Sequence, residues 1–148
     1  MRQESTEKET AETKGFVPKS VGVTFDKPYP RFWNTTVNKT YFFNVLGLLG
    51  PGFERLFLLS VLTFRKRLKG SALEQPAAIF MAQEAQHDHQ IKTFNETLER
   101  QHQYPMKRLE TFVFKLCKRV AKRCSPELQL AMTVGGEHIV AVFSDFIL

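Results

Sequence analysis

Cysteine is scarce in this sequence of 148 residues, where only Cys117 and Cys124 are present. They stand seven residues apart on one predicted helix, about 10 Å along its axis, which is too far for an intramolecular disulfide. Residues 1–14 contain only two apolar residues, Met1 and Ala11, and so lack the apolar stretch of a secretion signal. We therefore expect a cytoplasmic protein whose residues 1–14 form a disordered tail.

A long, uninterrupted apolar run is also lacking. The most apolar stretch, residues 41–64, is broken by Pro51-Gly52 and carries Glu54-Arg55 near its centre. Both features disfavour a transmembrane helix, because a helix breaker and two charges are costly in the middle of a bilayer. A buried helix that carries a functional carboxylate explains this stretch better.

Acidic residues are outnumbered by basic ones, which gives a formal net charge of +6 and a pI near 9.5. No nucleic-acid-binding motif accompanies this excess, so nucleic acid is not an expected partner. Much of it falls on the polar faces of a basic amphipathic helix, at Lys107, Arg108, Lys115, Lys118, Arg119, Lys122 and Arg123. A solvated surface is the simpler interpretation, and contact with an anionic membrane or an acidic partner is the alternative.

The rest of the chain favours a single all-α domain at residues 41–148, since 43% apolar content with 14 Phe can build a core. Prolines in residues 15–40 predict an extended arm, anchored by Trp33. Gly50-Pro51-Gly52 predicts the end of a short helix over residues 41–49 and the start of a second helix that runs to about Leu68.

Two further helices are predicted from capping patterns. Ser71 and Glu74 form a capping-box pattern before a helix from about Ala72 to His102, and Ser125 is placed to cap a helix that begins at Pro126. Residues 103–125, mostly one helix, are long enough to cross the length of the bundle. The last helix would therefore run parallel to the helix at 72–102.

The stretch from Gln83 to Gln90 carries Glu84 and His87, which share one face of a helix because they are three residues apart. If the helices before and after Gly70 form a hairpin, Glu54 reaches the same level along the bundle. Glu137 reaches it as well if its helix runs parallel to that of Glu84. Glu54, Glu84, His87 and Glu137 are thus candidate metal ligands, with a structural cluster of polar side chains as the alternative. His89 lies about 200° around the helix from His87 and is expected to be exposed.

Three motifs carry a family resemblance: Pro51-Gly52-Phe53-Glu54-Arg55, then Gln83-Glu84-Ala85-Gln86-His87 with Phe94-Asn95 downstream, then Glu137-His138 after Leu130 to Thr133. They resemble the segments PxGERFF, QExxHxxxHxxFN and LTxxxEH of bacterial proteins labelled predicted metal-dependent hydrolases. The resemblance implies a ferritin-like bundle with metal ligands at Glu54, Glu84, His87 and Glu137. It also implies a second ExxH on a fourth ligand helix, which this chain lacks, so we expect a truncated bundle. Ile91 stands where the family often has a further His, and Gly135-Gly136 precede Glu137.

Hard carboxylate oxygens with one imidazole favour iron or manganese, up to two per complete site. The resemblance implies a metal-dependent hydrolase in which Glu54, Glu84 and Glu137 serve the activation of water for attack on a small-molecule substrate. Three alternatives stay open: a di-iron oxidase or oxygenase, an inactive fragment that binds a partner through the helix at 107–123, and a homodimer that completes the site.

Overall fold

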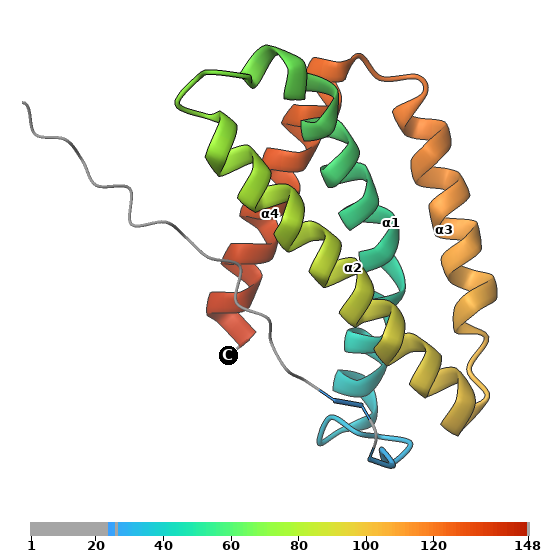
Figure 1. Cartoon of the computed structure of the whole chain (residues 1–148). Helices are drawn as coiled ribbons and strands as arrows, with labels where there is room; N and C mark the ends of the chain where they lie inside the picture. The colour runs from blue at the N-terminus through green and yellow to red at the C-terminus, as the bar shows by residue number, and fades with distance from the viewer. Residues whose placement is uncertain (1–23, 26, 148) are drawn as a thin grey trace, which may run out of the picture.

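The computed structural model describes residues 24–25 and 27–147, and these form an all-α bundle, as predicted (Figure 1). The helices are α1 (Val37–Leu68), α2 (Glu74–His102), α3 (Met106–Ala121) and α4 (Pro126–Ile147). The predicted tail, residues 1–14, and the first part of the predicted arm lie outside the described residues. The last residues assigned to the arm, 37–40, belong to α1.

Helix α1 is the element on which α2, α3 and α4 all pack. Figure 1 shows α2 and α4 running in one direction, and α1 and α3 in the opposite direction. Helix α3 is therefore the predicted crossover that makes α4 parallel to α2. Helix α1 is long and apolar enough to cross a membrane by length and composition alone, but here it is the central helix of the bundle.

The prediction that Gly50-Pro51-Gly52 separates two helices is wrong, because α1 continues through it as one helix of 32 residues. Pro51 has no backbone N–H, so the Gly47 carbonyl four residues earlier loses its helical donor. The side-chain amide of Asn95 on α2 supplies a replacement and donates to Gly47 O at 2.8 Å. A contact between two helices thus offsets the local cost of the proline.

The predicted cap of α2 is also wrong, whereas that of α4 is confirmed. Helix α2 begins at Glu74, and Glu74 N donates to the backbone carbonyl of Ser71. The Glu74 carboxylate accepts from Gly70 N at 2.6 Å, so it closes the turn instead of forming a capping box. At α4, Ser125 Oγ accepts from Leu128 N at 3.2 Å, which is the expected N-cap.

Trp33, the residue predicted to anchor the arm, lies against α1 and α2. Its indole Nε1 donates to Asn44 Oδ1 at 2.9 Å. Its ring meets the Phe94 ring edge to face, with 5.1 Å between centroids, and Phe25 and Tyr29 pack on the same Phe94 ring. Phe94 is therefore the residue on α2 that docks the arm.

Candidate metal centre

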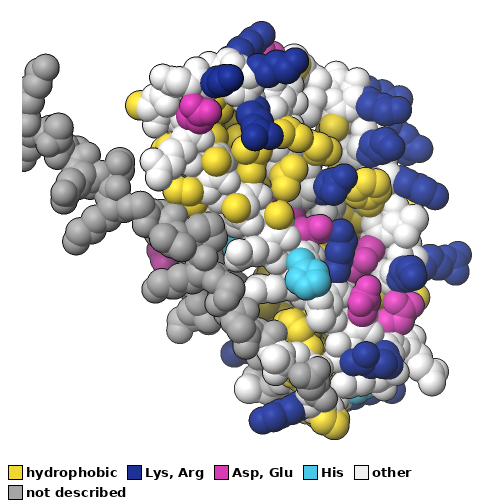
Figure 2. All heavy atoms as spheres, viewed as in Figure 1, with side chains coloured by type: hydrophobic (Ala, Val, Ile, Leu, Met, Phe, Trp, Pro, Cys, Tyr) yellow, Lys and Arg dark blue, Asp and Glu magenta, His cyan; other side chains and the backbone are white. Residues whose placement is uncertain are grey.

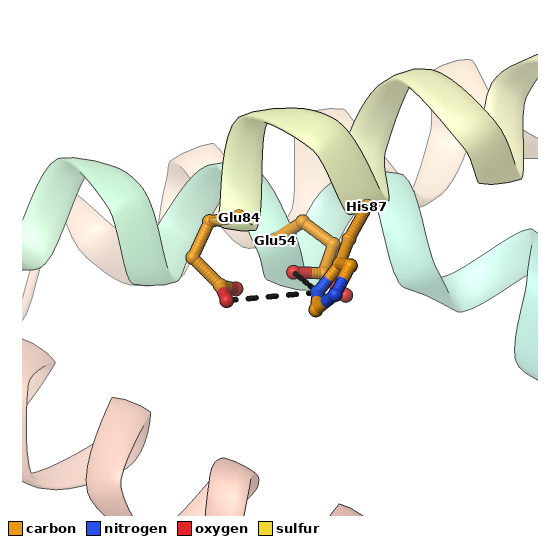
Figure 3. Close-up of side chains that lie close together, drawn as sticks. All are labelled: Glu54, Glu84 and His87. Carbon is orange, nitrogen blue, oxygen red and sulfur yellow. Dashed lines mark ion pairs between the residues drawn. The ribbon is translucent and has the colours of Figure 1, made fainter. Parts of the chain in front are cut away.

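Three of the four predicted ligands meet between α1 and α2. Glu54 projects from α1, and Glu84 and His87 project from one face of α2 toward it (Figure 3). Each residue offers one ligand atom such that all three atoms lie within 4.8 Å of one another. The separate predictions that Glu84 and His87 share a face and that Glu54 reaches their level agree with this placement. The metal-binding role of these residues stays a prediction.

His87 Nδ1 lies between the two carboxylates, 3.8 Å from Glu54 Oε2 and 3.7 Å from Glu84 Oε1. Burial differs sharply among the three side chains, which are 17% exposed for Glu54, 3% for Glu84 and 55% for His87. Glu54 Oε2 and Glu84 Oε2 are buried without a hydrogen-bond partner among the described residues. Because buried carboxylate oxygens are costly without a partner, these two oxygens call for a proton or a cation.

The two carboxyl groups differ in pKa. Burial first, and then the neighbouring Glu54, raises the pKa of Glu84 to about 9. Burial alone would raise the pKa of Glu54 as well, but interactions with His87 and Glu84 outweigh it and lower that pKa. The Glu54 carboxylate in turn raises the pKa of His87. Without a cation the pair therefore carries one proton at neutral pH, held on Glu84, and one negative charge, held on Glu54.

The donor set fits a divalent cation. Atoms bound to one ion at about 2.1 Å lie roughly 3.0 to 4.2 Å apart, and the two distances from His87 Nδ1 fall within this range. The set consists of two hard carboxylates and one imidazole, which suits iron, manganese or zinc better than a soft metal such as Cu(I). A cation would take the place of the proton on Glu84 and would satisfy Glu54 Oε2, and it would satisfy Glu84 Oε2 as well if that carboxylate binds through both oxygens.

Glu137 on α4 is not among the three donors that lie within 4.8 Å. Its carboxylate is half-buried and close enough to raise the pKa of both Glu84 and His87. Burial, and then the charge of Glu54, raises the pKa of Glu137 itself. The charge of Glu137, on α4, thus influences the residues of the centre. Its role as a ligand stays a prediction.

The approach of α4 to α1 sets the position of Glu137. A Cβ atom on Gly136 would lie 2.4 Å from Cζ of Phe57, so only glycine allows this contact. About one turn away, the hydroxyls of Ser60 and Thr133 share a buried hydrogen bond of 2.7 Å. The glycine pair that precedes Glu137 therefore permits close helix contact at Gly136, whereas a Cβ on Gly135 would meet nothing within 4 Å.

The register between α1 and α2 sets the other three side chains. A Cβ on Gly50 would lie 2.7 Å from Ile91 Cδ1, and Gly47 is bound by Asn95 about one turn further from the site. On the other side of Gly50, about one turn along α1, Glu54 lies opposite His87. Ile91, at the position where the resemblance implied a further His, therefore packs against a glycine of α1.

Asn95 lies about two turns from the centre, and its role in holding α1 against α2 was not predicted from the sequence. It is buried, and its side-chain Nδ2 donates to Gly47 O and to Glu110 Oε1 of α3. Pro51 is the available signal, because a proline inside a helix frees the carbonyl four residues earlier. His89 is exposed, as predicted. His138 and Asp145 are exposed as well.

Comparison with known proteins adds one match. A family model described as "predicted metal-dependent hydrolase" matches residues 17–148 of the chain, which includes all four predicted ligands. No curated protein and no solved structure matches the chain significantly.

Proposed function

This chain belongs to the family of predicted metal-dependent hydrolases, and we propose that it uses Glu54, Glu84 and His87 to hold a divalent cation for the hydrolysis of a small-molecule substrate. The observation that carries the proposal is that Glu54 Oε2 and Glu84 Oε2 are buried without a hydrogen-bond partner, on two carboxylates that bring Glu54 Oε2 and Glu84 Oε1 to within 3.8 Å of His87 Nδ1. When bound, such a cation supplies Lewis-acid activation of water and of a substrate oxygen.

The three side chains have different roles in the proposed site, because they differ in burial and pKa. Glu54, whose pKa is lowered, provides a permanent negative charge. Glu84, whose pKa is raised to about 9, holds a proton at neutral pH when no cation is bound, and would release it to bind the cation. His87 is exposed enough to lie between this pair and solvent, where its Nδ1 can hold the cation beside both carboxylates.

The finer assignment is a ferritin-like site with iron or manganese. We propose that Glu137 joins the centre as a third carboxylate and fourth ligand, supported by its electrostatic influence on Glu84 and His87. Two cations bridged by carboxylates from several helices would then occupy the space between α1, α2 and α4. The same donors would serve a di-iron oxidase, which is the second candidate function. It is favoured by the small number of imidazoles relative to carboxylates.

Metal content separates a working centre from a structural polar cluster. Protein purified with iron and manganese supplied should contain about one cation per chain for the three-donor site, or about two if Glu137 completes a second position. Glu84→Ala and His87→Ala should lose the metal. His89→Ala should retain it, because His89 is on the same helix, two residues from His87, and is exposed. Equal metal content in all four proteins would contradict the proposed site.

Reaction type is tested with the same protein. Hydrolysis of a panel of ester, amide and phosphoester substrates by the zinc form supports the hydrolase, because zinc has no redox chemistry. A new optical absorption band when the ferrous protein meets air, together with no zinc-dependent turnover, would support the oxidase instead.

A further inference from the structure

A groove of about 360 Å³ runs between α1 and α3, away from the candidate metal centre. This volume is within the range of sites that bind small molecules, roughly 300 to 1,000 Å³. Helix α1 contributes Leu56 and Leu59, and α3 contributes Phe114, Cys117 and Ala121. At 100° per residue, Leu56 points about 200° around α1 from Glu54, so the groove and the metal centre occupy opposite faces of that helix.

The floor of the groove is apolar. A Cβ on Gly52 would lie 2.9 Å from Val113 and 3.2 Å from Cys117 Sγ, so α1 and α3 touch there. Beyond this contact the two helices leave space that their apolar side chains line. Burial raises the pKa of the Cys117 thiol, so the thiol adds no negative charge to the floor at neutral pH.

Three cations line the groove around this apolar floor, namely Arg55 of α1, Lys118 of α3 and Lys122, the C-cap residue of α3. No Asp or Glu is among the lining residues, and no carboxylate of the described chain pairs with any of the three. Lys118 and Lys122 stand four residues apart on one helix, where two like charges repel each other. Figure 2 shows how Lys and Arg gather along the edge that α3 forms. An anion at the rim would relieve this repulsion.

We propose that the groove between α1 and α3 binds a single-chain anionic amphiphile, such as a medium- or long-chain fatty acid. The alkyl chain would lie on Leu56, Leu59 and Ala121, and the carboxylate would meet Lys118, Lys122 and Arg55. Charge complementarity selects the head group, and the apolar floor selects the chain. The site involves none of the candidate metal ligands, so it is independent of the proposed hydrolase function.

Isothermal titration calorimetry with monomeric dodecanoate tests this site. We expect about one dodecanoate per chain with a micromolar Kd, and a tightening of up to about fourfold for each methylene added from octanoate onward until the groove is full. Lys118→Gln with Lys122→Gln should weaken the Kd by about tenfold or more. Lys115→Gln with Arg119→Gln removes the same charge from the same helix outside the groove, and should leave the Kd within about twofold.

Three further experiments test whether dodecanoate binds in the groove itself. Ala121→Phe should block the groove, and its circular dichroism shows whether the fold is retained. In a Cys124→Ser background, dodecanoate should slow alkylation of Cys117, which lines the groove. Glu84→Ala should bind dodecanoate like the wild type, so a failed metal site leaves this test intact.

The proposal would be overturned by equal binding of dodecyltrimethylammonium, which has the same chain and a positive head. Equal weakening by the two charge pairs would overturn it as well, because a general field and not the groove would then attract the ligand. Sedimentation with anionic vesicles but no binding of monomeric dodecanoate would show that α3 recognises a lipid surface, and would also reject the groove.

Discussion

Asn95 on α2 donates its side-chain amide to the backbone carbonyl of Gly47 on α1, at 2.8 Å. That carbonyl is the one that Pro51 leaves without a helical donor. One hydrogen bond therefore keeps α1 continuous through a proline and ties α1 to α2 about two turns from Glu54. The same Nδ2 also donates to Glu110, so the contact joins three helices.

Replacing Asn95 with Ala should lower the free energy of unfolding by about 1–3 kcal/mol, because the partly buried Gly47 carbonyl loses its donor. Chemical denaturation measures the change. The informative control is Pro51→Ala, which restores a backbone N–H for Gly47. In that background Asn95→Ala should cost less, and equal costs in both backgrounds would show that the proline and the amide are not coupled.

The two adjacent glycines of α4 should respond in opposite directions to alanine. Gly136→Ala places a Cβ 2.4 Å from the buried Phe57 ring, so it should destabilise the protein by about 1–3 kcal/mol. Gly135→Ala meets nothing within 4 Å and should stabilise α4 by up to about 1 kcal/mol. Thermal unfolding of the two variants measures both effects, and similar melting temperatures would mean that α4 does not approach Phe57 this closely.

The metal-free protein should lose stability as the pH rises from 5 to 9. The pKa of Glu84 is about 9 in the folded protein against an ordinary value of 4.5, so the folded state holds one more proton in this range. Raising the pH therefore lowers the free energy of unfolding. Glu84→Gln, which is neutral at every pH, should flatten this dependence and be more stable than the wild type at pH 8.

Since one pKa unit corresponds to about 1.4 kcal/mol, the gain at pH 8 should reach at least that size. Urea denaturation at a series of pH values measures it. Glu96→Gln is the matched control, because Glu96 lies on the same helix and is exposed. A wild-type stability that stays level from pH 5 to 9 would show that Glu84 titrates normally.

Binding of Mn²⁺ at pH 7 should release about one proton per cation, because the cation replaces the proton on Glu84. Calorimetry in two buffers with different ionisation enthalpies counts the released protons. Affinity should fall as the pH is lowered, since protons compete for the same oxygens. Binding without proton release would place the cation away from Glu84.

Phe94 should hold the arm in place through its contacts with Trp33, Tyr29 and Phe25. Phe94→Ala should expose Trp33, the only tryptophan of the chain, and shift its fluorescence to longer wavelength. Phe112→Ala is the control, because Phe112 is 67% exposed and distant in sequence from the arm. An unchanged emission maximum in the Phe94 variant would contradict the docking.

The sequence was most informative where local rules decide the outcome. The helix predicted from about Ala72 to His102 matches α2, which begins two residues later, and Ser125 predicted the start of α4. The break at Pro51 was predicted wrongly because the group that offsets it, Asn95, lies 44 residues further along the chain. Rules that consider only neighbouring residues cannot predict a hydrogen-bond donor from a distant part of the chain.

The sequence predicted only the level of each site residue along the bundle axis. Counting residues gives the height of a side chain along the bundle, and this brought Glu54 to the level of Glu84 and His87. Counting does not give the distance across the bundle. That distance depends on packing, such as the contact of Gly136 with Phe57, and it keeps Glu137 outside the group of three donors.

The register of α1 against α2 resides in pairs within the helices, with Gly47 against Asn95, Gly50 against Ile91 and Glu54 against His87. The connection at residues 69–73 takes no part in these pairs. The length of this connection can therefore change without moving the candidate centre. One residue inserted between Gly50 and Glu54 would instead turn Glu54 by about 100° around α1, away from both partners. Insertions should thus be tolerated in the connection at residues 69–73, and should disrupt the centre when they fall within the paired parts of α1 and α2.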